Sequence, residues 1–451
     1  MAKVHSTTAV IPIESSNGEI NEESNCSDID LKKETLTVER ERLFAEFKAE
    51  NRMKRFKDIV TNSTAENFSI TPILFIFIYL IVSLVVILPV ACIPFHNVIR
   101  EPQYWYEYHL LIIHLPLVLG TGFLLNSSNW TNITYLRKWK HLLYICLSGY
   151  STKVICYGSA YLIWTYLFEL SWPVPFGVYL NWWIIIAIMI ATLYLQFPFD
   201  WRTEEEFQER LKNLVIALLW EINGLSCIHL IFGIMFSEFR NNYQWVVAIA
   251  LFPIREACKI LLDRFGKKAS NGDPTAAEIT STFTFATLHA IFECYIVGDL
   301  ATTTSTFIII SQEFIPMIYL VLQIIWIKKK RPDDVREQIK LLQNLVVKEM
   351  VGFLVPIIFL SCFTVAYFGP NSELLGNVRN NYWNYRAVED YGSYVRKVLM
   401  VFFIDVVAMI LSSVVLWKTC KIHLYRIYSA LHDEFGRLFL INIVRWIMSV
   451  I

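Results

Sequence analysis

Long runs of apolar residues, almost free of charge, recur along this chain from residue 70 onward and limit the folds open to it. The run at 71–94 contains no Asp, Glu, Lys or Arg. A helix of about 20 such residues crosses the hydrocarbon core of a bilayer, and a segment in lipid must satisfy its backbone hydrogen bonds internally. Apolar residues make up 55% of the chain and charged residues 18%, which excludes an ordinary soluble domain. We therefore expect an all-α fold, a polytopic helical bundle in a membrane.

Runs long enough to cross the bilayer occur about ten times. We expect them at 71–94, 109–125, 142–168, 178–197, 214–236, 243–262, 279–297, 307–327, 351–368 and 398–417. The run at 243–262 leaves two alternatives open, because it contains Pro253 and then three charged residues. It crosses with these charges near its cytosolic end, or it re-enters the membrane without crossing.

The chain divides into four expected regions. Residues 1–30 are polar and lack aromatic side chains, which predicts a disordered tail. Residues 31–69 are expected to form a charged cytosolic helix, either solvated or docked on the membrane or on the protein's own loops. The transmembrane bundle occupies 70–420. Residues 421–451 are expected to form an amphipathic interfacial segment, because their apolar run is too short to cross easily.

Lys and Arg are unevenly distributed among the expected loops. The segment before the first run and the loop at 328–348 are rich in them, whereas the loop at 298–305 has none. Because basic residues favour the cytosolic side, we expect both termini in the cytosol. The basic loop at 369–397 does not follow this alternation, which we attribute to its length. Three glycosylation patterns lie in a loop that this topology places in the cytosol, where glycosylation does not occur, and we attribute these patterns to chance. They begin at Asn126, Asn129 and Asn132.

Ionisable side chains within the apolar runs are the candidates for function, since a charge at the bilayer centre costs about 2.5–3.5 kcal/mol on insertion scales. We expect the following residues to line a cavity or to couple to an ion: Glu221, His289, Glu293, Glu313 and Asp405. We expect a second group to pair internally instead: Lys153, Arg255 and Glu256. The alternative for any of the carboxyls is a structural ion pair, such as Lys153 with Glu221 or Arg255 with Glu293.

Two spacings strengthen this interpretation. His289 and Glu293 are one helical turn apart and share a face. Gln312 and Glu313 come just before Pro316, which cannot donate a backbone hydrogen bond and so leaves carbonyl oxygens available.

Signals for other chemistry are lacking. The sequence has no phosphate-binding loop, no paired histidine motif and no metal-ligand spacing, so we predict no catalytic residue, metal or cofactor. A net charge near zero gives no reason to expect nucleic acid as a partner. Membrane lipid is the expected partner, and the sequence does not indicate an oligomeric state.

The function that fits best is a transporter or channel-like protein with an acidic midplane cavity for an unspecified small molecule or ion. Two alternatives remain open. One is a membrane receptor or scaffold without transport, in which the carboxyls are buried in salt bridges. The other is a membrane-embedded acyl- or lipid-modifying enzyme that uses His289.

Overall fold

A computed structural model describes the chain in separate stretches: residues 47, 50–60, 71–92, 127–128, 139–162, 187–197, 199–239, 243–270, 274–299, 303–369 and 391–450. All the secondary structure in these stretches is helical. By its contacts the chain forms two units, Met1–Arg40 and Glu41–Ile451, and every helix given below belongs to the second. The expected tail at 1–30 and the expected span at 109–125 lie outside the described residues.

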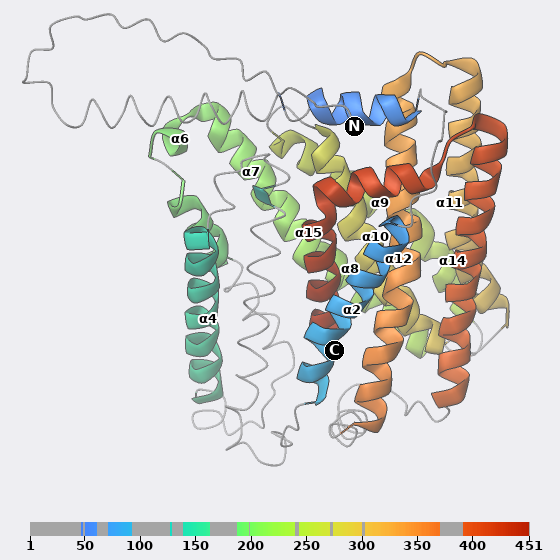
Figure 1. The fold of residues 1–451 in the computed structure, drawn as a ribbon. Coiled ribbons are helices and arrows are strands. Elements are labelled where there is room, and N and C mark those ends of the chain that lie inside the picture. Colours follow the sequence, from blue (N-terminus) through green and yellow to red (C-terminus); the bar gives the residue numbers. More distant parts are fainter. Residues whose placement is uncertain are drawn as a thin grey trace, which may run out of the picture. The chain divides into compact units, whose positions relative to one another are not determined.

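Figure 1 labels, in chain order, eleven helices in the described part of the second unit. They are α2 (Thr71–Cys92), α4 (Trp139–Leu162), α6 (Phe199–Thr203), α7 (Glu205–Leu219), α8 (Leu225–Glu238), α9 (Gln244–Ala269), α10 (Pro274–Asp299), α11 (Thr303–Lys330), α12 (Val335–Phe368), α14 (Tyr391–Cys420) and α15 (Leu424–Val450). A π-helical turn, Trp220–Gly224, joins α7 to α8.

Three of the described helices are long and apolar enough to cross a membrane: Phe307–Lys330 within α11, Val335–Val365 within α12, and α14. This is the composition of an integral membrane protein, but the number is below the expected ten. Of the other expected spans, 109–125 and much of 178–197 lie outside the described residues. Helix α9 carries charges within its length, which lowers its hydropathy.

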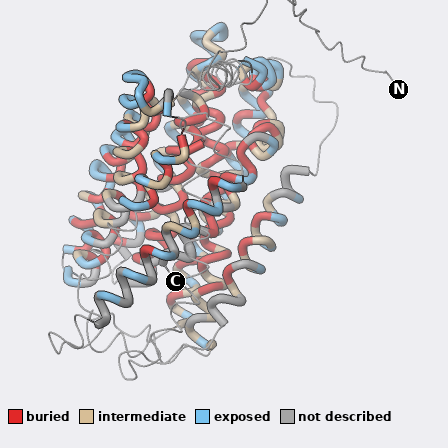
Figure 2. Tube along the Cα trace, turned by 90° about the vertical axis from the view of Figure 1, so that its left-hand side faces the viewer, coloured by how far each residue is buried: buried red, intermediate tan, exposed pale blue. Residues whose placement is uncertain are grey.

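Helices α10 and α12 form the centre of the packing. Helix α12 packs against α2, α10, α11, α14 and α15, and α10 packs against α8, α9 and α14 as well. Phe283 of α10 is fully buried and stacks on Phe439 of α15, with ring centroids 4.2 Å apart. In Figure 2 the buried positions lie on the inward sides of these helices and the exposed ones on the outward sides.

The outward sides of the spanning helices are apolar. Phe307, Leu322 and Trp326 of α11 and Phe403 and Ile410 of α14 are all more than half exposed. Soluble monomers rarely expose so much apolar surface along neighbouring helices. These faces are suited to contact with lipid.

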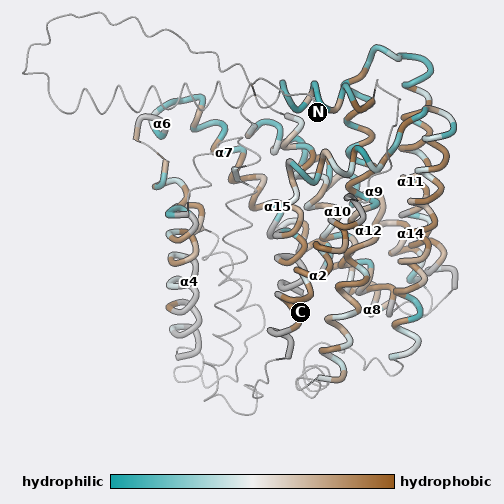
Figure 3. The backbone as a smooth tube through the Cα atoms, viewed as in Figure 1, coloured by the Kyte–Doolittle hydropathy of each residue, from teal (hydrophilic) through white to brown (hydrophobic). Residues whose placement is uncertain are grey.

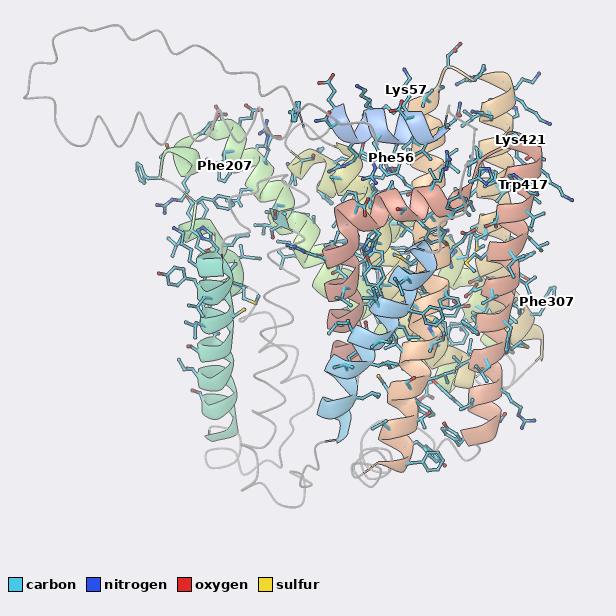
Figure 4. All side chains as sticks on the ribbon, in the orientation of Figure 1. Phe56, Lys57, Phe207, Phe307, Trp417 and Lys421 are labelled. Atoms are coloured by element: carbon cyan, nitrogen blue, oxygen red, sulfur yellow. The ribbon has the colours of Figure 1, made fainter. Side chains whose placement is uncertain are left out.

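Hydrophilic residues gather at one end of the helices. Figure 3 shows the helix at 50–60, the start of α7 and the turn between α11 and α12 as hydrophilic backbone at this end. In Figure 4, Lys57 and Lys421 lie toward it, whereas Phe307, at the start of α11, lies toward the other. Segments far apart in the sequence that we expect in the cytosol therefore share one end.

The helix at 50–60 is docked on the protein. Phe56 and Val60 are buried, and the Lys328 ammonium donates a hydrogen bond to the carbonyl of Val60 over 3.2 Å. Arg55 pairs with Asp433 of α15 at 2.5 Å. The described part of this region thus contacts α11 and α15, and a cytosolic position for it stays a prediction.

Helix α15 packs into the body of the second unit. It contacts α2, α10 and α12, and Ile427, Leu431, Phe435 and Ile443 are buried. Figure 1 shows its first half crossing one end of the helices before the second half turns to run along α2. The apolar face of this segment is thus covered by the protein itself, and an interfacial position for 421–451 stays a prediction.

Candidate functional site: a buried polar centre

Arg255 of α9 is the centre of a polar cluster formed by three helices. The side chain is 4% exposed. Its Nη1 donates to Nε2 of His289 on α10 over 2.7 Å, and its Nη2 donates to the backbone carbonyl of Gln312 on α11 over 3.1 Å. Because arginine only donates, Nε2 of His289 acts here as an acceptor, and the imidazole is neutral. One guanidinium therefore ties α9 to both α10 and α11.

The carbonyl of Gln312 is available to Arg255 because of a proline one turn later. Inside a helix this carbonyl would accept from the N–H of residue 316, but that residue is Pro316 and has no N–H. The side-chain amide of Gln312 donates in turn to the carbonyl of Ala248 on α9. Both ends of one glutamine thus join α11 to α9.

A second histidine lies beside the cluster. His229 of α8 is buried, and its Nδ1 donates to the carbonyl of Leu225 over 2.7 Å. Its ring centroid lies 5.9 Å from that of His289 and 4.6 Å from that of Phe292. Phe292 belongs to an apolar cluster of α8, α9, α10, α11 and α14 that adjoins the polar centre. Such surroundings have a low dielectric and strengthen electrostatic interactions.

One carboxylate in contact with Arg255 partly compensates its charge. Glu256 Oε1 lies 3.5 Å from the Arg255 Nε, and the Glu256 side chain is 39% exposed. The guanidinium also lies over the ring of Phe252, 5.3 Å from its centroid. Arg255 and Glu256, both expected to pair internally, are thus in contact as sequence neighbours, and the wider internal pairing stays a prediction.

Two further carboxyls are buried on the flanking helices. Glu221, fully buried, lies in the π-helical turn. Next to it, Trp220 Nε1 donates to the carbonyl of Cys258 on α9 over 3.2 Å, which fixes this turn against α9. Glu293 is buried on α10, one turn from His289. The buried interior therefore holds carboxyls as well as the arginine and the two histidines.

The remaining predicted residues are placed less centrally or are not described. Asp405 of α14 lies against Gly352 of α12, where a Cβ would come 2.9 Å from its Oδ2. The side chains of Lys153 and Glu313 lie outside the described part of the chain. The structure therefore brings together Arg255, Glu256 and His289, and it places Asp405 at a separate helix contact.

Sequence reasoning missed one buried carboxyl, Glu349 of α12. It lies between the expected loop at 328–348 and the expected span at 351–368. The cap of α12 gives a signal that could have placed it in a helix. The carboxylate of Asp334 accepts from the backbone N–H of Glu337 over 3.3 Å, so α12 begins at Val335 and already includes Glu349.

The polar centre contains a buried guanidinium that contacts neutral hydrogen-bond acceptors. The Arg255 guanidinium has neutral partners in His289 and the Gln312 carbonyl, which an anionic or hydrogen-bond-accepting group could replace. Within the residues that the structure describes, no group of His, Cys, Asp and Glu has the arrangement of a metal site. Comparisons with family models, with curated proteins and with solved structures gave no match to this chain.

Proposed function

We propose that this chain is a multi-pass transporter or channel-like protein that crosses the membrane about ten times and moves a small solute or ion through the polar centre. The observation that carries the proposal is the buried Arg255, held between α10 and α11 by His289 and a carbonyl that Pro316 releases. Ionisable residues inside membrane helices usually face a pathway or a partner. Helices interrupted near the midplane, with free backbone groups, form solute sites in many transporters.

The ten-span topology has support from the position of the hydrophilic segments. The segments expected in the cytosol share one end of the second unit (Figures 3 and 4). The sixth expected span is one continuous helix, α9, rather than two short arms. We infer that α9 crosses and that both termini are cytosolic.

Accessibility labelling of single cysteines tests this topology. A cysteine placed in 298–305 should be labelled only from outside, and one placed in 328–340 only from the cytosol. Labelling of both positions from the same side would show that the topology is wrong.

The transport proposal is tested at Glu293, which is buried one turn from His289. Glu293→Gln keeps the shape and the hydrogen-bonding groups but removes the charge. If Glu293 binds a proton or a cation during transport, the variant folds but loses pH- or cation-dependent flux in proteoliposomes. Glu337→Gln, at a half-exposed position on α12, is the matched control. Normal stability together with wild-type ion dependence in Glu293→Gln would exclude Glu293 from the pathway.

A receptor or scaffold without transport is the second candidate function. The observation that favours it is that one guanidinium braces three helices, as a purely structural contact would. In that case Arg255→Gln lowers thermal stability, whereas proteoliposomes of the wild type show no flux of protons, Na⁺, K⁺ or Cl⁻ above empty vesicles. Arg264→Gln, at an exposed position on the same helix, controls for loss of charge.

The enzyme alternative needs His289 as a base. Its Nε2 already accepts a hydrogen bond from Arg255, so this nitrogen cannot accept a proton from a substrate until that bond breaks. We therefore consider modification of acyl groups or lipids a weaker candidate function than transport or scaffolding.

A further inference from the structure

A second buried polar site lies apart from the polar centre, where α12 meets α15. Glu349 of α12 is 2% exposed, and the hydroxyl of Tyr428 on α15 donates to its Oε2 over 3.0 Å. Its Oε1 is buried and forms no hydrogen bond within the described part of the chain. Ser412 of α14 lies beside the carboxyl. The hydroxyls of Tyr428 and Ser412 favour the ionised carboxylate, but burial of a charge with only these neutral partners costs more, which favours the protonated acid.

A small cavity adjoins Tyr428. Its volume is about 10 Å³, close to the smallest that holds one water molecule. The polar residues in its lining are Tyr428 and His432 of α15, one turn apart, and Tyr79 of α2. The rest of the lining is apolar, so a water here would have only these side chains to bond to.

His432 lines this cavity and is itself partly exposed. Its Nδ1 shares a hydrogen bond with the hydroxyl of Tyr79. Gly436 leaves room for that bond, because a Cβ there would come 2.5 Å from the Tyr79 oxygen and 2.9 Å from the His432 Nδ1. The next residue, Asp433, pairs with Arg55 at the half-exposed contact with the helix at 50–60.

Burial lowers the pKa of His432, although the neighbouring Asp433 acts in the opposite direction. The imidazole is therefore neutral near neutral pH and can take up a proton and pass it on. The titratable group facing Glu349 is Tyr428, and the one facing His432 across its Nδ1 is Tyr79.

We propose that Glu349 is an internal proton-binding site that exchanges its proton with the aqueous phase through Tyr428, one water in the cavity and His432. In the uptake direction, protonated His432 gives a proton to the water, and the water gives one to the Tyr428 oxygen. Tyr428 gives its own hydroxyl proton to Oε2 of Glu349. Each carrier gains one proton and loses one, so the net change moves one proton from His432 to Glu349. Tyr79 is a positioning residue that orients the imidazole. This inference does not depend on the transport proposal.

Infrared difference spectroscopy of the full-length protein in detergent tests the protonated state. At neutral pH the C=O band of a protonated carboxyl should be present in the wild type and in Glu337→Gln, and absent in Glu349→Gln. If Glu349→Gln does not fold, Glu349→Asp keeps the carboxyl and should shift the band. If no carboxyl band changes on substitution of Glu349, then Glu349 is ionised and the proposal is wrong.

Transfer into D₂O tests the relay. Exchange of the Glu349 acid proton, read as the isotope shift of the same band, should slow by about tenfold or more in Tyr428→Phe and in His432→Leu, because each removes a positioned proton carrier. Tyr79→Phe should slow it less, since the imidazole keeps its ring nitrogens. Equal exchange rates in the wild type, Tyr428→Phe and His432→Leu would overturn the relay, whatever the outcome of the flux assays.

Discussion

Replacement of Gly352 by alanine tests whether Asp405 faces α12. An added Cβ would lie 2.9 Å from the Asp405 Oδ2 and 3.1 Å from its Cγ. Ordinary contacts lie at about 3.5–4.0 Å, so the carboxyl must move. Overpacking of this kind costs about 1–3 kcal/mol, whereas Gly→Ala in a helix interior gains about 1 kcal/mol. We therefore expect Gly352→Ala to destabilise the protein by about 1 kcal/mol.

The effect of Gly352→Ala on stability should change sign when the Asp405 carboxyl is absent. In an Asp405→Ala background nothing opposes the gain in helix propensity, so Gly352→Ala should stabilise by up to about 1 kcal/mol. Thermal unfolding of the four proteins in detergent gives the coupling between the two positions, which we expect to be about 2 kcal/mol. An equal rise in apparent Tm in both backgrounds would refute the contact between Asp405 and α12.

Three further predictions concern other parts of the chain. Burial, opposed in part by Lys259, raises the pKa of Asp263 from 3.8 to about 6. The folded state therefore binds this proton more tightly than the unfolded state, so stability falls as the pH rises from 3.8 through about 6. Asp263→Asn should remove this pH dependence and raise the Tm at neutral pH, with a gain in the free energy of unfolding of no more than about 3 kcal/mol. Phe56→Ala should release the helix at 50–60 and speed limited trypsin cleavage within it, whereas Phe47→Ala, at an exposed position, should not. Deletion of 1–30 should leave the elution profile in detergent unchanged, and a loss of folded protein would show that this segment packs.

The sequence was sufficient to predict an all-helical membrane protein. Lipid offers the backbone no hydrogen-bond partners, so long apolar runs have few stable conformations other than the helix. It also located Pro316 and the carbonyl that this residue leaves available, since the missing N–H is a local property of proline. The buried His289 and Glu293 follow from helical spacing alone.

Other features depend on packing between helices and could not be predicted. Arg255 was expected to pair internally, with Glu293 as one alternative partner, and its described contacts include His289, Glu256 and a carbonyl of α11. Nothing in the local sequence indicates which of several buried acceptors a long, flexible guanidinium reaches. The Glu349–Tyr428 contact joins residues 79 positions apart, and only the packing of α15 on α12 brings them together.

The bond from Arg255 to the Gln312 carbonyl has a consequence for mutagenesis. Its acceptor is a backbone atom, so alanine scanning of Gln312 removes the amide and leaves this bond intact. The position that controls the acceptor is Pro316, which makes no hydrogen bond itself. A residue with an N–H at 316 would compete with the guanidinium for one oxygen. A scan of side chains would therefore detect the loss of this hydrogen bond at Pro316, one helical turn away from Gln312, whose carbonyl accepts it.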